Sequence, residues 1–271
     1  MARNDIYDTQ HNGNCSDEIY KPKITTPPTK MHHSLEFKDL YYRYPNGQEA
    51  LRGINLKITH GEHVALIGAN GAGKSTLQLL TNGLLMPSSG EVIVGEVKLQ
   101  PSTLRLIRQS VGLVFQDADN QLFMSTVEED VAFGPRNLGL SEEEVSGRVI
   151  DALREVGAEH LLSKSPTQLS GGEKRRIAIA TTLSMTPSIL VMDEPTANLD
   201  PKSRRQLITL LRGFDHTLLL ATHDMDLAAE LCRRIVILSQ GEIMADGSAE
   251  EIFLNKELLE SCSLEQPYAY R

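Results

Sequence analysis

The stretch HVALIGANGAGKSTLQLL, residues 63–80, sets a short apolar strand, a glycine-rich loop and a helix directly one after another. Its first six residues are mostly apolar and predict a buried strand that runs straight into the loop. The helix is expected to begin at Lys74 and to continue to about Leu85, before Pro87. A loop between a strand and a helix N-terminus is a setting in which backbone N–H groups bind phosphate.

The loop fits the pattern G-x-x-x-x-G-K-[ST], which runs from Gly68 to Ser75. Glycines at 71 and 73 let N–H groups approach phosphate oxygens without interference from a Cβ atom. We expect Lys74 to contact the β- and γ-phosphates and the Ser75 hydroxyl to bind Mg²⁺. A chance glycine turn is the alternative, and the strand and helix on its flanks disfavour it. The predicted nucleotide contacts of the loop are Gly68, Asn70, Gly71, Gly73, Lys74, Ser75 and Thr76.

Apolar strands alternate with helices along residues 34–271, which predicts one α/β domain with a mainly parallel sheet buried on both faces. The early strands are more amphipathic and are expected to form a separate antiparallel layer. Residues 117–182 are expected to form a helical subdomain, and 234–271 a closing hairpin with short helices. The other strands are expected at 35–44, 53–58, 63–68, 111–116, 189–192 and 217–221.

The composition limits the possible functions. The chain has 271 residues, of which 40% are hydrophobic, and its net charge of −9 argues against general attraction to nucleic acid. Three cysteines without metal-ligand spacing predict reduced thiols, as in a cytosolic protein. Residues 1–33 are polar and predict a disordered tail, in which His32 and His33 are expected to have no specific role. No apolar run approaches the ~20 residues that span a bilayer.

Two carboxylates, Asp193 and Glu194, close an apolar strand at the end where the ligands of an α/β sheet bind. Two adjacent acids there are costly unless a cation or a substrate is close. Asp193 is the expected ligand of Mg²⁺, and Glu194 is placed to orient or deprotonate an attacking water. Capping of the next helix is the alternative, which Pro195 disfavours.

Two further polar residues, Gln116 and His223, also stand at the ends of apolar strands. From there Gln116 could bind the metal and the water, and His223 could hydrogen-bond the γ-phosphate. A lone glutamine or histidine is more often structural, so only the shared position at strand ends favours the catalytic interpretation. We therefore expect both residues at the catalytic site with Glu194.

A second glycine motif, LSGGEKRR, occupies residues 169–176. Ser170 and Glu173 fit a capping box, so a helix begins here. Gly171 and Gly172 fall in its first turn, where each glycine costs up to ~1 kcal/mol relative to alanine. An approaching phosphate explains them better than a helix start does. Because the chain already has one phosphate loop, this second anion site is expected to complete the site of another chain.

Together these motifs resemble those of ABC transporter ATP-binding subunits. GANGAGKST is similar to their Walker A motif, ILVMDE to Walker B and LSGGE to the signature motif, while Gln116 and His223 match the Q-loop and the switch histidine. The resemblance covers residues 35–255 and implies a P-loop ATPase fold of the ABC type. It also implies that Tyr44 stacks on adenine, that Asp200 contacts a partner chain, and that ATP with Mg²⁺ lies between two subunits.

A narrower resemblance begins at Gln116. The segment QDADNQLF is similar to that of energy-coupling factor ATPases of cobalt and nickel uptake, with Ala118 in the usual place of proline. It implies an ATPase that powers cobalt or nickel import from the cytoplasmic face of the membrane. The implied partners are a transmembrane coupling protein, a substrate-specific membrane subunit and a second ATPase in a homodimer or heterodimer. The alternatives are a vitamin importer, another ABC transporter, or a soluble ABC ATPase acting on ribosomes or DNA, which the acidic composition disfavours.

Overall fold

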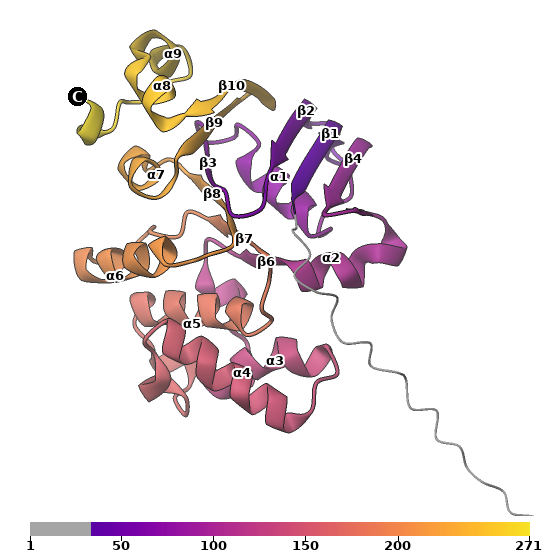
Figure 1. The fold of residues 1–271 in the computed structure, drawn as a ribbon, viewed down its shortest axis with the longest axis vertical. Helices are drawn as coiled ribbons and strands as arrows, with labels where there is room; N and C mark the ends of the chain where they lie inside the picture. The colour runs from indigo at the N-terminus through magenta and orange to yellow at the C-terminus, as the bar shows by residue number, and fades with distance from the viewer. Residues whose placement is uncertain (1–33) are drawn as a thin grey trace, which may run out of the picture. The chain divides into compact units, whose positions relative to one another are not determined.

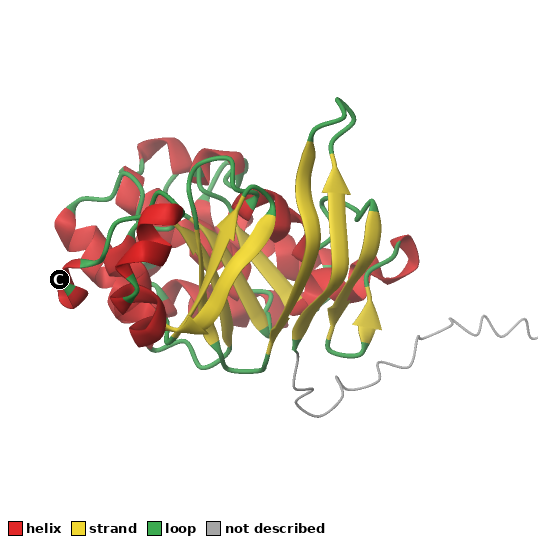
Figure 2. Cartoon of the chain, turned by 90° about the horizontal axis from the view of Figure 1, so that it is seen from above, coloured by secondary structure: helices red, strands yellow, loops and turns green. Residues whose placement is uncertain are grey.

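The computed structural model describes residues 34–271, so the tail expected at 1–33 lies outside the described residues. Within the described part, two β-sheets stand next to each other and helices pack around them (Figure 1, Figure 2). Among residues 34–271, no helix has both the length and the hydropathy that a membrane-spanning segment requires.

The first sheet is antiparallel, in the strand order β2-β1-β4-β5. It is the separate layer expected from the amphipathic early strands. Strands β4 and β5 were not among the strands predicted from the sequence. The strands are β1 (Leu35–Arg43), β2 (Glu49–Ile58), β4 (Ser89–Val94) and β5 (Val97–Lys98).

The second sheet has the order β10-β9-β3-β8-β7-β6. Five of its strands are parallel, as the alternation of strands and helices predicted, and β10 pairs with β9 antiparallel at one edge. The hairpin expected at the C-terminal end is therefore this edge. The strands are β3 (His63–Ile67), β6 (Val111–Val114), β7 (Ile189–Asp193), β8 (Thr217–Thr222), β9 (Arg234–Ser239) and β10 (Glu242–Ser248).

Both faces of the second sheet are buried, which explains the continuous apolar runs in its strands. Successive side chains of a strand point to opposite faces. In β8, Leu219 packs with the side of the first sheet, whereas Leu218 and Leu220 pack with the helices on the other side. All three side chains are fully buried. The sheet thus forms the middle layer, and its strand ends carry the site.

Helix α1 ends four residues before the predicted end. It covers Lys74–Thr81, because Gly83 adopts a left-handed conformation (φ 70°) that helices often use to stop. The helices α2 and α6 to α9 follow the strands on the outside of the sheet. They are α2 (Leu104–Ser110), α6 (Pro201–Arg212), α7 (Met225–Leu231), α8 (Ala249–Leu254) and α9 (Lys256–Ser261).

Three helices fill the chain between β6 and β7 and lie together below these strands in Figure 1. They are α3 (Val127–Asn137), α4 (Glu142–Glu155) and α5 (Gly171–Leu183). The predicted capping boxes begin two of them: Ser141 caps α4 through Glu144, and Ser170 caps α5 through Glu173. The second glycine motif lies in this segment, at the start of α5.

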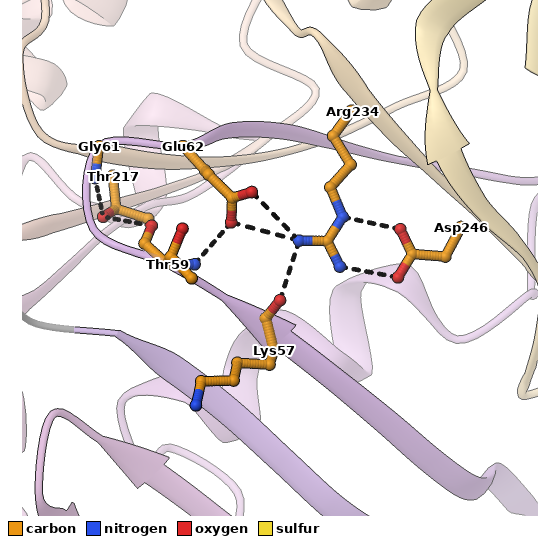
Figure 3. A network of polar contacts seen from close by, with 7 residues as sticks. All are labelled: Lys57, Thr59, Gly61, Glu62, Thr217, Arg234 and Asp246. Carbon is orange, nitrogen blue, oxygen red and sulfur yellow. Dashed lines mark hydrogen bonds and ion pairs between the residues drawn. The ribbon is translucent and has the colours of Figure 1, made fainter. Parts of the chain in front are cut away.

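A polar network joins the two sheets at the amino ends of the parallel strands (Figure 3). The guanidinium of Arg234 donates to both oxygens of Asp246 at 2.7 Å, to the carbonyl oxygen of Lys57 at 2.9 Å, and to Glu62 Oε2 at 3.2 Å. Nearby, Thr217 Oγ1 accepts from the backbone N–H of Gly61 at 3.0 Å. Because Lys57 belongs to β2 and Arg234 to β9, this network ties the first sheet to the second.

Candidate nucleotide site

The phosphate loop lies between β3 and α1, at the carboxyl end of the sheet. Neighbouring backbone holds it in place: the Gly241 N–H donates to the carbonyl oxygen of Ala72 at 3.0 Å. Gly73 is left-handed (φ 108°), and a Cβ there would lie 2.7 Å from the carbonyl oxygen of Ala50. From the sequence, we expected a glycine at position 73 because a phosphate approaches the backbone there. In the structure, the neighbouring protein backbone itself leaves no room for a side chain at this position. Gly71 (φ 81°) faces open space, which leaves room for a ligand.

Lys74 is almost completely buried, and its ammonium group bends back over the loop. Nζ donates to the carbonyl oxygens of Gly68 at 2.7 Å and Ala69 at 3.2 Å. Burial lowers the pKa of Lys74, and the charges of Glu194 and Asp193 oppose this effect. The amine is therefore held inside the loop, beside both acids, where it could exchange carbonyl oxygens for phosphate oxygens.

Asp193 ends β7 and meets the first turn of α1. Ser75 Oγ donates to Asp193 Oδ2 at 2.7 Å. Burial raises the pKa of Asp193, the Ser75 bond lowers it, and the neighbouring Glu194 raises it. A hydroxyl and a carboxylate oxygen at this distance are hard ligands of the kind that Mg²⁺ prefers. Ser75 and Asp193, the two residues predicted to bind Mg²⁺, are thus in contact. Asp193 does not cap the following helix.

Glu194 is turned away from Asp193 toward the end of β8. Its backbone is left-handed (φ 43°), a strained conformation for a residue with a side chain. Oε1 accepts from the backbone N–H of His223 at 2.9 Å and from its ring Nδ1 at 2.7 Å. Oε2 accepts from Thr222 Oγ1 at 2.9 Å. The expected catalytic base and the expected phosphate-sensing histidine therefore touch each other directly.

Gln116 follows β6, which ends at Val114, two residues earlier than predicted. Its side chain is exposed, while its carbonyl oxygen accepts from Arg175 of α5. The same guanidinium donates to the carbonyl oxygen of Phe115 at 2.6 Å. Arg175 is 5% exposed and also interacts with the charge of Asp193. The second glycine motif thus carries the residue that fixes the backbone at Gln116.

Tyr44 lies at the start of the turn after β1 and is partly buried. Its hydroxyl is 2.9 Å from Thr76 Oγ1, in the helix that follows the phosphate loop. Its ring meets that of Tyr42 edge to face, with the centroids 4.9 Å apart. The structure therefore places Tyr44 beside the loop, and its stacking on adenine stays a prediction.

The second glycine motif begins α5. Both the backbone N–H and the hydroxyl of Ser170 bond to Glu173 Oε2, at 2.8 and 2.7 Å. Gly171 faces open space, but a Cβ on Gly172 would lie 2.5 Å from Ser203 Oγ. Gly172 thus has a packing reason within the chain, which the sequence argument missed. Asp200 caps α6 by accepting from the N–H groups of residues 202 and 203.

The predicted residues thus form two groups. The first consists of the phosphate loop, Tyr44, Asp193, Glu194 and His223, which hydrogen bonds and charge interactions connect. Gln116 is linked to this group through Arg175, which donates to its carbonyl oxygen and interacts with the charge of Asp193. The second joins the start of α5 to Asp200 at the start of α6. Two residues of the first group, Thr222 and Arg175, were not predicted, although both stand next to predicted ones. A cavity of about 440 Å³ beside Asn70 and His223 is also lined by C-terminal residues such as Arg271, which no sequence signal indicated.

A buried lysine in a glycine-rich loop, with two acids at a strand end of the same sheet, defines a P-loop nucleotide-binding protein. The family described as ABC transporter matches residues 51–197. The chain belongs to the ABC transporter family of ATP-binding domains. It is an ATPase with the ABC fold.

Two relatives and two solved structures are similar over most of the chain. A protein of Geobacter sulfurreducens named as an ABC transporter ATP-binding protein is 57% identical, over 87% of this chain and 95% of its own. The energy-coupling factor transporter ATP-binding protein EcfA of Methanothermobacter thermautotrophicus is 49% identical, over 86% and 76%. The structure of CbiO1 from Clostridium perfringens, part of the ABC transporter complex CbiONQ, matches with a TM-score of 0.75 and 40% identity, over 85% and 94%. A dimeric ATP-binding cassette with ADP and phosphate bound matches at 0.72 and 31%, over 79% and 98%.

Proposed function

We propose that the chain is the ATP-hydrolysing subunit of an energy-coupling factor importer and acts as a dimer at the cytoplasmic face of the membrane. The observation that carries this proposal is the division of the site into two groups. The first holds Lys74, the two acids and His223, whereas the second contains Ser170 and the backbone N–H groups of Gly171 and Gly172 at a helix start. Two copies placed head to tail bring the second group of each to the first group of the other. The relative named EcfA supports the assignment to an energy-coupling factor transporter, and the dimeric cassette supports the dimer.

The phosphates of ATP would lie in the loop. Lys74 Nζ would then exchange its bonds to the carbonyl oxygens of Gly68 and Ala69 for bonds to the β- and γ-phosphates. Because both carbonyls belong to the loop itself, the ammonium group needs to move only a short way. The open side of Gly71 receives the phosphate oxygens. From the other copy, Ser170 and the start of α5 contact the γ-phosphate.

Mg²⁺ fits the donor set at the end of β7. Ser75 Oγ and Asp193 Oδ2 are 2.7 Å apart and would both turn to the cation, and the exposed amide of Gln116 is a third oxygen ligand. When bound, the ion neutralises charge on the transferred phosphate. Burial of Asp193 strengthens its attraction to a cation, since the surroundings screen charge less than water does.

Glu194 would orient or deprotonate the water that attacks the γ-phosphate. In the structure, the ring of His223 forms a hydrogen bond to Glu194 Oε1. The His223 ring is 67% exposed, and the Glu194 side chain 9%. The ring is therefore free to turn to a γ-phosphate, which leaves Oε1 open to water.

An exposed aromatic pair marks the proposed contact with the membrane partner. Phe123 and Phe133 are 63% and 41% exposed, and their rings meet edge to face at 5.0 Å. The buried carboxylate of Asp130 accepts from the N–H groups of Phe123 and Met124, both at 3.0 Å, and so holds this loop in shape. We infer that a helix of the transmembrane coupling protein packs on these rings. Such exposed aromatic surface is typical of interaction sites.

For the cargo, we propose cobalt or nickel, from the segment QDADNQLF at 116–123. An importer of vitamins is the alternative, since the same ATPase architecture would serve it. A soluble ABC ATPase acting on ribosomes or DNA is less compatible with the exposed aromatic pair and with the net charge of −9.

The test combines ATP hydrolysis, dimerisation and partner capture by the full chain. Glu194→Gln should abolish hydrolysis and trap a dimer in MgATP, whereas Glu257→Gln on the surface of α9 should change neither. Phe123→Ser with Phe133→Ser should lose co-purification of membrane subunits but keep the intact fold, and Met244→Ser, another exposed apolar position, should retain them. Loss of cobalt or nickel uptake in cells carrying Glu194→Gln would identify the cargo. A Glu194→Gln protein that stays monomeric in MgATP with its partners present would refute the dimer.

A further inference from the structure

The side chain of Thr222 lies directly under the proposed catalytic base. It is the last residue of β8 and is fully buried. Its Oγ1 accepts from the backbone N–H of Asp224 at 3.0 Å and lies 2.9 Å from Glu194 Oε2. Because an N–H occupies one lone pair of the hydroxyl and a carboxylate can only accept, the hydroxyl proton points at Glu194.

This contact differs from the other side-chain contact of Glu194. Oε1 is bonded by the His223 ring, which is exposed and which the proposed mechanism turns to the γ-phosphate. When the ring leaves, the carboxylate keeps the backbone N–H of His223 on Oε1 and the Thr222 hydroxyl on Oε2. The strand that carries Thr222 is fixed in the sheet, so this hydroxyl does not follow the ring.

We propose that Thr222 is a positioning residue for ATP hydrolysis: its hydroxyl fixes the direction of the Glu194 carboxylate after His223 has turned away. Glu194 needs such support for two reasons. Its backbone has a strained, left-handed conformation, and its carboxylate must keep pointing at the attacking water. A charge-assisted hydrogen bond from a buried, immobile donor supplies it. This inference rests on the proposed role of Glu194 as base.

The strand offers a matched control. Thr217 begins β8, is also fully buried, and its hydroxyl also accepts from a backbone N–H, that of Gly61 (Figure 3). Thr217 and Thr222 are thus the same residue type at the two ends of one strand, and Thr217 belongs to the network that contains Arg234. Replacing either by valine keeps the shape of the side chain and removes the hydroxyl.

The experiment measures kcat, KM for ATP and the melting temperature of the full chain in Thr222→Val, Thr222→Ser, Thr217→Val and Glu194→Gln. Thr222→Val should lower kcat roughly ten- to a hundredfold with KM changed less than about twofold, as expected for a lost bond to a charged group. Thr222→Ser should restore most of the kcat, and Thr217→Val should keep it.

Three results would overturn the inference. One is a Thr222→Val enzyme with kcat within twofold of the wild type while Glu194→Gln is inactive. The second is an equal loss in Thr222→Ser, which would assign the effect to packing of the methyl group. The third is an equal loss in Thr217→Val, which would assign it to the strand. A fully active Glu194→Gln enzyme would instead refute the proposed base, and the positioning role with it.

Discussion

The hydroxyl of Ser75 donates to Asp193 Oδ2 across 2.7 Å and so joins the first turn of α1 to the end of β7. Two elements more than a hundred residues apart in the chain meet at this bond. It stands where a divalent cation would be held, because both atoms are hard oxygen donors. The bond therefore joins the two proposed ligands of the cation.

We expect Ser75→Ala to weaken Mg²⁺ binding. The variant removes one of the proposed ligands, so the Mg²⁺ concentration for half-maximal ATPase should rise roughly tenfold or more, which corresponds to about 1.4 kcal/mol. Ser110→Ala, whose hydroxyl bonds only within α2, is the control and should leave the Mg²⁺ dependence unchanged. Equal Mg²⁺ dependence in the two variants would exclude Ser75 as a ligand.

We expect Arg175→Met to destabilise the chain and to disturb Gln116. The substitution leaves the carbonyl oxygens of Phe115 and Gln116 without their buried donor. The free energy of unfolding should fall by about 2 kcal/mol, measured by urea denaturation. Arg105→Met, at an exposed position of α2, should cost almost nothing. A variant as stable as the wild type would show that these carbonyl oxygens find other partners.

Acid should destabilise the chain through three capping boxes. Serine side chains and backbone N–H groups lower the pKa values of Glu144, Glu173 and Glu251 below the ordinary value of 4.5. A lowered folded-state pKa means that the stabilisation is present above 4.5 and is lost as the pH falls through the folded-state values. The melting temperature should therefore be flat near neutral pH and fall below about pH 4.5.

The matched test of this pH dependence is the triple variant Glu144→Gln, Glu173→Gln and Glu251→Gln. Glutamine keeps the shape of a capping box and does not titrate. Between pH 6 and pH 3.5 the melting temperature of the variant should fall less steeply than that of the wild type, as recorded by circular dichroism. Parallel curves would assign the acid sensitivity to other groups.

We expect Arg234→Met to separate stability from catalysis. The variant removes the bonds to Asp246, Glu62 and Lys57 at the amino ends of the strands, which should cost about 2 kcal/mol of folding free energy. ATPase activity per folded molecule at low temperature should persist, because the site lies at the opposite ends of the strands. Arg233→Met, the exposed neighbour, is the control. Loss of kcat without loss of stability would contradict this separation.

The sequence predicted which residues lie together where short motifs follow the ends of strands or begin helices. The phosphate loop, the acid pair and His223 lie together because parallel strands present their carboxyl ends at one edge. The capping boxes at Ser141 and Ser170 were also correct, since their hydrogen bonds span only three residues.

The residues that the sequence missed depend on contacts between distant segments. Arg175 reaches the Gln116 carbonyl across 59 positions, and Thr222 reaches Glu194 across 28. Gly73 and Gly172 are restricted by Ala50 and Ser203, which no spacing rule brings near them. Such contacts arise only when distant segments pack together. A motif can therefore show that a glycine is needed, but it does not show which neighbouring group restricts that position.

The backbone contacts behind the phosphate loop have a consequence for binding. Gly241 bonds to Ala72, and Ala50 lies against Gly73, so the loop is preorganised by the β9–β10 turn and the start of β2. A flexible loop would lose conformational entropy when it closed on a nucleotide, and that loss would subtract from affinity. Here the phosphate loop already has its shape before a nucleotide binds. During turnover, we expect the side chains of residues such as Lys74 and His223 to rearrange instead.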